Sequence, residues 1–212
     1  MRKILLTSAG FATSNITEAF LDLVDRSPNE LTAVIMTTAA VQLKSHARPS
    51  LKAKQALDSM GFRKVEFIDI EFEDADKLNK YDVICLSGGN PFHLLHHLRR
   101  SGADQIIESL SKNGVVLVGI SAGTVVLGPD IRIVDYFTPH LNHVGMHDLT
   151  ALRLHEPITF PHYGRHDKFP HDETIEARIQ QFESTHQCEI LRITDHEALY
   201  INGETMTKIS HD

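Results

Sequence analysis

Short apolar runs alternate with amphipathic segments through the first 130 residues. Each run is typical of a buried strand, and the segments between runs repeat their apolar positions at helical spacing. The predicted strands are 3–8, 31–37, 65–70, 81–86 and 115–118, and the predicted helices are 15–25, 50–60, 91–98 and 103–111. Such alternation predicts an α/β fold in which helices cover both faces of a mostly parallel sheet.

The last third of the chain shows a different pattern. Residues 129–171 contain few periodic segments and are rich in histidine and proline. The elements predicted here and beyond are strands at 131–134, 157–160, 189–193 and 198–201, a helix at 172–182 with an acidic cap, and a hairpin turn at Asn202-Gly203. Because no repeat, low-complexity tract or linker interrupts the chain, we expect one domain over residues 1–212.

The composition favours a cytoplasmic enzyme. The 212 residues carry 28 acidic and 21 basic side chains, a net charge of −7, and no basic block, which argues against nucleic-acid partners. No apolar stretch approaches the roughly 18 residues of a membrane span, and the first residues are typical of a strand rather than a signal peptide. Cys85 and Cys188 lie in or beside predicted strands, which indicates buried thiols rather than a disulfide framework.

The most informative stretch is Gly119-Ile120-Ser121-Ala122-Gly123, which directly follows the aliphatic run 115–118. A buried strand that enters Gly-x-Ser-x-Gly and then a helix is typical of a nucleophile elbow, in which the serine is held in a strained conformation. Glycine suits the flanking positions because a Cβ there would collide with a neighbouring strand or helix. Amides at the helix start could receive an oxyanion. The alternative is a turn that simply starts a helix.

A second glycine turn, Ser87-Gly88-Gly89-Asn90, follows the strand predicted at 81–86, and Pro91 marks the start of the next helix. In parallel sheets, binding sites form beyond the carboxyl ends of the strands. Both glycine turns lie at such ends, so we expect them to share a pocket.

A serine nucleophile requires a base within hydrogen-bond reach and usually a carboxylate that orients the base. Among fourteen histidines, His162 is the best placed, because it follows the strand predicted at 157–160 at its carboxyl end. Two orienting acids remain open: Asp135, after the strand predicted at 131–134, and Glu197, between two C-terminal strands. Either could instead be an exposed acid at a strand end.

Other histidines form two groups with spacings that zinc sites use. The groups are His93, His96 and His97 at helical spacing, and His140, His143 and His147 in a looser series. The chain has no HExxH sequence, and no cysteine accompanies either group. We therefore interpret them as a solvated helix face and a polar loop, and expect no metal and no organic cofactor.

The elbow, the turn and helix start Leu86–Leu95, and the pair Pro161-His162 together resemble the peptidase E (aspartyl dipeptidase) family of serine peptidases, which includes the cyanophycinases. The resemblance extends from the first strand to the C-terminal hairpin. It implies a three-layer α/β sandwich of flavodoxin-like type, similar to class I glutamine amidotransferases. It also implies a monomer or homodimer that hydrolyses dipeptides or very short peptides, with a preference for an N-terminal aspartate, and that needs no cofactor.

The resemblance also implies roles for single residues. Ser121 matches the nucleophile and His162 the base, while Glu197 matches the supporting acid and Asp135 is the alternative acid. The oxyanion and substrate are expected near Gly88, Gly89, Asn90 and Ala122, with Gly89 and Ala122 donating the amides.

One position departs from the dipeptidase pattern E-T-R-x-x-R-I. Ile175 stands where the pattern has its first arginine, whereas Arg178 retains the second. Isoleucine cannot form the bidentate contact with a substrate aspartate that arginine offers. Arg165 and Arg178 are therefore predicted to bind the substrate, and Arg132 is a further candidate.

Three other functions are consistent with parts of the sequence. A cyanophycinase-like enzyme would cleave β-linked Asp–Arg polymers by the same chemistry, but it needs a groove for which this chain offers little sequence. An α/β-hydrolase esterase shares Gly-x-Ser-x-Gly, but it usually has its histidine near the C-terminus. A non-catalytic ligand-binding relative would have no need of Ser121, His162 and Glu197 together.

Overall fold

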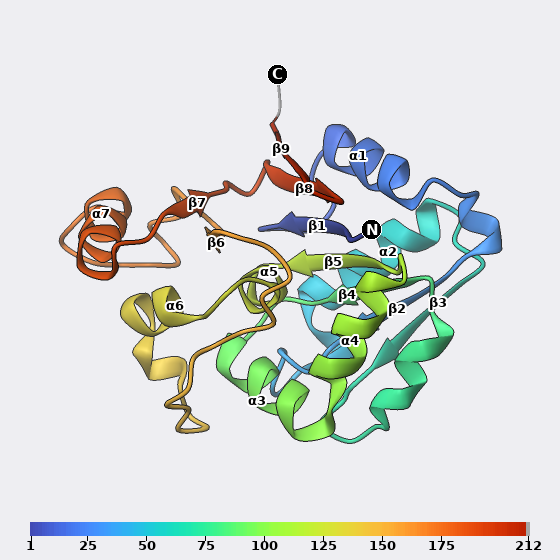
Figure 1. Cartoon of the computed structure of the whole chain (residues 1–212), viewed down its shortest axis with the longest axis horizontal. Helices are drawn as coiled ribbons and strands as arrows, with labels where there is room; N and C mark the ends of the chain where they lie inside the picture. The colour runs from blue at the N-terminus through green and yellow to red at the C-terminus, as the bar shows by residue number, and fades with distance from the viewer. Residues whose placement is uncertain (211–212) are drawn as a thin grey trace.

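The computed structural model describes residues 1–210, and a seven-stranded sheet runs through its centre (Figure 1). The strands are β1 (Lys3–Thr7), β2 (Thr32–Met36), β3 (Lys64–Ile68), β4 (Val83–Leu86), β5 (Val116–Ile120), β8 (Ala198–Asn202) and β9 (Thr205–Ile209). Their order is β3-β2-β4-β5-β1-β8-β9. The first five strands in this order are parallel, and β8 and β9 complete the edge as an antiparallel hairpin.

Helices cover both faces of the sheet because its parallel strands are apolar on both sides. In β1, Ile4 and Leu6 pack into one core cluster while Leu5 packs into the other. The helices are α1 (Ser14–Val24) and α2 (Arg48–Ser59) on one face, and α3 (Pro91–Ser101), α4 (Ala103–Lys112) and α5 (Ala122–Leu127) on the other. This confirms the predicted three-layer α/β sandwich with a mostly parallel sheet.

Residues 129–193 build a smaller lobe beside the sheet (Figure 1). Its elements are α6 (Arg132–Phe137), α7 (Ile175–His186) and the parallel strands β6 (Ile158–Phe160) and β7 (Ile190–Arg192). Short 3₁₀ turns lie at Pro28–Glu30, Lys44–His46, Ala75–Lys80 and Pro139–Leu141. Within the described residues, no helix has the length and apolar character needed to cross a membrane.

Three local predictions are wrong. The segment 131–134 is not a strand but belongs to α6, in which Ile133 and Phe137 lie one helical turn apart and are both buried. The helix predicted at 15–25 begins and ends one residue earlier, because Thr13 caps α1 by accepting a hydrogen bond from the amide of residue 16. The last helix begins later than predicted, and Thr174 rather than an acid caps it.

Gly123 is the glycine whose replacement is expected to disturb the fold most directly. A Cβ at this position would lie 2.1 Å from the carbonyl oxygen of Leu86, so α5 would have to move away from β4. We expect Gly123→Ala to lower the free energy of unfolding by about 3 kcal/mol or more through this overpacking. Chemical denaturation would measure the loss.

Gly114→Ala is the control, because a Cβ there meets no atom within 4 Å and only the positive φ of +87° opposes it. That strain is expected to cost roughly 1–2 kcal/mol. Equal losses for the two variants would contradict the steric explanation.

Candidate active site

Ser121 lies in the sharp turn between β5 and α5. Its backbone has φ 51° and ψ −105°, a strained conformation that projects the side chain out of the strand direction. The Ser121 amide donates a hydrogen bond of 2.9 Å to the carbonyl of Thr7 at the end of β1, which fixes the turn. A Cβ at Gly119 would lie 2.7 Å from the Cα of Thr124, and a Cβ at Gly123 would lie 2.1 Å from the carbonyl oxygen of Leu86. The sequence therefore forms the predicted elbow because only glycine fits on either side of it.

The second glycine turn directly adjoins the first. Gly89 has φ +152°, and a Cβ there would lie 2.1 Å from the carbonyl oxygen of Ala39. A Cβ on Gly88 would lie 3.3 Å from the Cβ of Ser121. Gly89 and Ser121 line the same cavity, so the two turns share a pocket as expected.

Two backbone amides beside Ser121 are available for a ligand. Within the described residues, neither the amide of Gly89 nor that of Ala122 donates a hydrogen bond. Asn90 has a different role from the one predicted for it. Its side chain caps α3 and donates a hydrogen bond of 2.7 Å to the carbonyl of Leu141, so it holds the pocket together rather than lining it.

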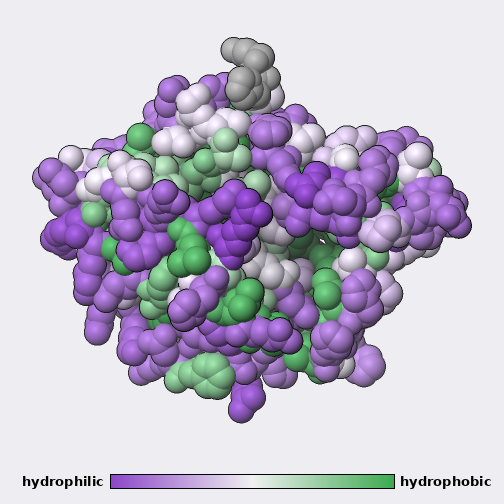
Figure 2. All heavy atoms as spheres, turned by 180° about the vertical axis from the view of Figure 1, so that it is seen from behind, coloured by the Kyte–Doolittle hydropathy of each residue, from purple (hydrophilic) through white to green (hydrophobic). Residues whose placement is uncertain are grey.

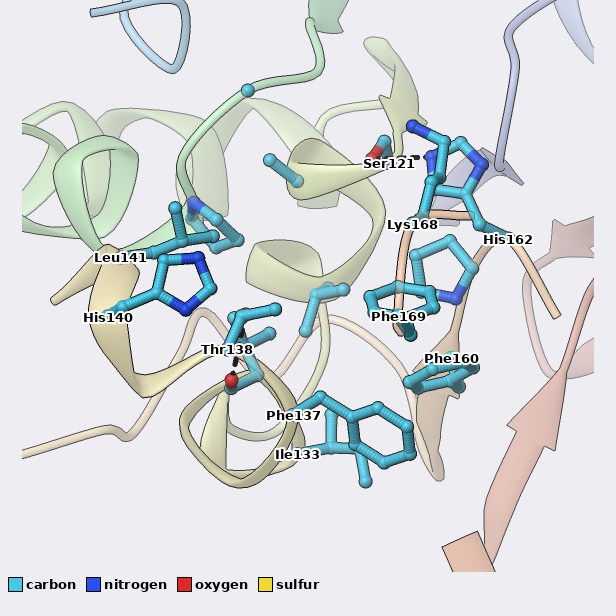
Figure 3. A pocket seen from close by; sticks show the side chains of 16 residues that line it. Ser121, Ile133, Phe137, Thr138, His140, Leu141, Phe160, His162, Lys168 and Phe169 are labelled. Atoms are coloured by element: carbon cyan, nitrogen blue, oxygen red, sulfur yellow. Dashed lines mark hydrogen bonds between the residues drawn. The ribbon is translucent and has the colours of Figure 1, made fainter. Parts of the chain in front are cut away.

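His162 reaches Ser121 from the end of β6 (Figure 3). Its Nε2 lies 2.9 Å from Ser121 Oγ, and only 8% of the residue is exposed. The backbone of His162 has a left-handed φ of 59°. Its amide donates to Ser8 Oγ at 2.9 Å, and this hydroxyl donates to the carbonyl of Ile193, so residues at the ends of β1 and β7 together hold the backbone of His162.

Asp195, and not Glu197, is the carboxylate beside His162. Asp195 Oδ1 lies 2.5 Å from His162 Nδ1. Glu197 faces its own loop, where it accepts from the amide of Thr194 at 2.8 Å and pairs with Lys208 at 2.9 Å. The structure thus places beside His162 a carboxylate two residues before the one predicted.

Asp135 is also displaced from the position that the sequence suggested. It lies in the first turn of α6 rather than after a strand. Within the described residues it makes no hydrogen bond or ion pair with His162.

Sequence reasoning missed Asp195 although the relevant signal was present. Asp195 follows β7, which pairs in parallel with β6, so the carboxyl ends of both strands lie side by side. The rule that selected His162 after β6 therefore applies equally to the loop after β7. That loop contains both Asp195 and Glu197, and only its folded conformation decides which carboxylate faces the imidazole.

Burial and neighbouring charges together lower the pKa of His162 and also that of Asp195. Burial lowers the pKa of His162, Asp195 opposes that effect, and the positive charges of Lys168 and Arg165 reinforce it. Burial alone would raise the pKa of Asp195, but its hydrogen bonds to His162 and Arg165 hold it below its usual range. Both shifts favour a neutral imidazole beside an ionised carboxylate near neutral pH.

The predicted substrate-binding arginines have structural partners instead. Arg165 binds Asp195 and also forms a two-pronged contact with Asp167 at 2.7 and 2.8 Å. Arg178 is buried, with its guanidinium 4.0 Å above the ring of Phe137. Neither arginine lines the cavity beside Ser121, and Arg132, which pairs with an aspartate, does not line it either.

The cavity beside Ser121 has a volume of about 310 Å³. Figure 3 shows the rings of Phe137, Phe160 and Phe169 on one side of it, and Lys168 extending beside His162 towards Ser121. From behind, a hollow with hydrophobic residues separates the main body from the lobe that carries α7 (Figure 2). The lobe thus supplies much of the wall, while the sheet supplies the serine.

Of the histidine groups, the first is not a solvated helix face. His93 and His97 are buried, and their ring nitrogens lie with a carboxylate oxygen of Glu71 within 4.8 Å of one another. These three could hold a cation, but Lys44 already pairs with Glu71. The positive charge beside Glu71 thus comes from the side chain of Lys44. In the second group, His140 lines the cavity beside Ser121.

Comparisons with known proteins agree with this fold. The model of peptidase family S51 matches residues 4–209. An uncharacterized peptidase from Listeria monocytogenes serovar 1/2a is 35% identical over 160 residues, which cover 73% of this chain and 75% of the relative. An uncharacterized peptidase from Pasteurella multocida is 30% identical over 210 residues, which cover 97% of this chain and 96% of the relative.

A solved structure extends the likeness to three dimensions. The crystal structure of a peptidase E-like protein from Listeria monocytogenes EGD-e covers the whole of both chains, with a TM-score of 0.78 and 28% sequence identity. The resemblance that the two glycine turns and the Pro-His pair indicated is thereby confirmed. The chain belongs to peptidase family S51.

Proposed function

We propose that this chain is a serine exopeptidase that hydrolyses dipeptides or very short peptides through Ser121, His162 and Asp195. One observation carries the proposal: a continuous hydrogen-bonded series from Ser121 Oγ to His162 Nε2 at 2.9 Å and from His162 Nδ1 to Asp195 Oδ1 at 2.5 Å. Nucleophile, base and orienting acid stand in the order that acyl transfer requires. Family membership supplies the reaction class.

In the proposed mechanism, neutral His162 accepts the hydroxyl proton as Ser121 Oγ attacks the peptide carbonyl. Asp195 fixes the tautomer and stabilises the imidazolium that forms. The amides of Gly89 and Ala122 donate to the oxyanion of the tetrahedral intermediate, and each donor is worth about 10²–10³-fold in rate in comparable sites. His162 then protonates the leaving amine, and water releases the acyl group.

Two features support short peptides as substrates. The cavity of about 310 Å³ is small and suits the side chain of one residue rather than a polymer. Lys168 lines its mouth and extends towards Ser121, where an ammonium group could pair with the free carboxylate of a short peptide (Figure 3). The same features argue against a cyanophycinase-like action on long chains.

The roles of the two C-terminal carboxylates can be separated by mutation. Asp195→Asn keeps the size of the side chain but favours the wrong imidazole tautomer, so kcat should fall by about 10⁴-fold. Glu197→Gln is the matched control and should change kcat by less than about tenfold, because Glu197 binds the amide of Thr194 in its own loop and the ammonium group of Lys208. Steady-state assays on a dipeptide panel measure both, with Ser121→Ala as the inactive reference.

Undiminished turnover by Ser121→Ala would reject the serine mechanism. The opposite order of the two carboxylate variants would return the orienting role to Glu197. A wild-type protein without turnover on any short peptide would favour a non-catalytic relative.

The pH dependence follows from the depressed pKa of His162. The base must be neutral, so kcat/KM should fall as the pH drops through the His162 pKa, which lies below the ordinary value of about 6.5. Lys168→Met removes one of the charges that lower this pKa and should move the acid limb to higher pH. A limb that stays in place or moves to lower pH would contradict this electrostatic description.

Lys168→Met also tests how the carboxylate is bound. On the pH plateau of each protein, the variant should raise KM for a dipeptide by about three- to tenfold, because an exposed ion pair contributes modestly. The C-terminally amidated form of the same dipeptide lacks the carboxylate, so its KM should be unchanged by the mutation. Equal effects on the two substrates would exclude Lys168 as the anchor.

A further inference from the structure

The wall of the cavity beside Ser121 is apolar over most of its extent. The side chains that form it come from α5, α6, the 3₁₀ turn after α6, β6 and the loop after β6: Val125, Ile133, Phe137, Leu141, Phe160 and Phe169. Ile133, Phe137 and Phe160 are buried in the same core cluster that packs against the sheet. The wall is thus an extension of the core, and it is not free to rearrange around a charged group.

Besides His162, the described residues that line the cavity include two basic side chains, Lys168 and His140. Lys168 is exposed and lies next to Ser121, and His140 lies beside Leu141, so neither stands among the rings of Phe137, Phe160 and Phe169 (Figure 3). Arg165 is occupied by Asp195 and Asp167, and Arg178 lies behind Phe137. An aspartate side chain among these rings would therefore lose hydration without a compensating ion pair, which is strongly unfavourable.

The space suits an apolar side chain well. A cavity of about 150 Å³ lined by Leu, Ile and Phe is large enough to bind benzene. The cavity here is about twice that size, at roughly 310 Å³, so a leucine, methionine or phenylalanine side chain fits with room for the scissile peptide near Ser121.

We propose that this cavity binds an uncharged apolar or aromatic side chain, that of the residue whose carbonyl Ser121 attacks. The substrates are then peptides with an apolar first residue, and the preference for an N-terminal aspartate that the family resemblance implied does not apply to this chain. The catalytic part rests on the proposed function, whereas the binding preference stands on the cavity alone.

The direct test measures binding and turnover separately. Ser121→Ala protein is titrated calorimetrically with Leu-Ala, Phe-Ala and Asp-Ala, and wild-type kcat/KM is measured for the same dipeptides. We expect the apolar dipeptides to bind and to react at least about tenfold better than Asp-Ala. Equal or better binding of Asp-Ala overturns the inference.

The two proposals fail in different ways. Hydrolysis with Asp-Ala as the best substrate would keep the peptidase and reject the apolar site. Selective binding of Leu-Ala or Phe-Ala without hydrolysis by wild type would reject the peptidase and keep the apolar site. Absence of both binding and turnover would reject both.

A charge placed in the wall supplies a second test. Phe169 is half-buried at the cavity, so Phe169→Arg adds a guanidinium there without deleting a fully buried core residue. It should lower kcat/KM for Leu-Ala by about tenfold or more. The ratio of kcat/KM for Leu-Ala to kcat/KM for Asp-Ala should therefore fall towards one or below it. Phe72→Arg is the matched control, because Phe72 is 76% exposed and lies outside the cavity. An identical ratio in both variants overturns the inference.

Discussion

The site depends on one steric constraint, the contact of α5 with the ends of β4 and β5 through two positions that have no Cβ. Gly123 brings the helix against the carbonyl of Leu86, and Gly119 brings the strand against Thr124. The chain between them has to turn within a few residues, which holds Ser121 at a positive φ. Packing on both sides of the turn holds this strained conformation, so the hydroxyl is positioned before any substrate arrives.

The backbone of His162 is held by groups from two parts of the chain. Ser8, at the end of β1, accepts from the amide of His162 and donates to the carbonyl of Ile193 at the end of β7. One hydroxyl thus links the central sheet to the small lobe at the place where the lobe presents His162 and Asp195 to Ser121. Arg165 completes the arrangement by binding the second oxygen of Asp195, which keeps this carboxylate ionised and oriented.

Sequence patterns predicted the features that repeat or that backbone sterics dictate. Strict alternation of strand and helix gave the central sheet, and the glycine pairs around Ser121 and at Gly88-Gly89 gave the elbow and its neighbouring turn. The His162 prediction followed from its place at the end of a strand. These rules succeed because each needs only a short segment of chain and the geometry of parallel strands.

The remaining features could not be predicted because they arise from irregular loops. Asp195 and Glu197 lie two residues apart in one loop, and hydrogen bonds to Thr194 and Lys208 turn Glu197 away from the imidazole. The apolar segment 131–134 is too short to distinguish a strand from a helix, and it folds as α6 because Ile133 and Phe137 are buried together. Contacts between distant segments decided both cases.

The same distinction, between backbone geometry at the sheet and side chains from the lobe, separates the proposed reaction from the proposed substrate preference. Ser121 and the two amides beside it are set by backbone geometry at the sheet, and almost any change in that geometry disturbs the fold as well. The wall of the cavity is set by side chains of the lobe, such as Phe137 and Phe169, which lie on elements outside the sheet. Under the proposed function, replacing a half-buried side chain such as Phe169 changes what the cavity accepts and leaves Ser121 and His162 in place. A resemblance in the glycine turns therefore predicts substrate preference less well than it predicts the reaction. Substrate preference has to be inferred from the individual side chains of the lobe.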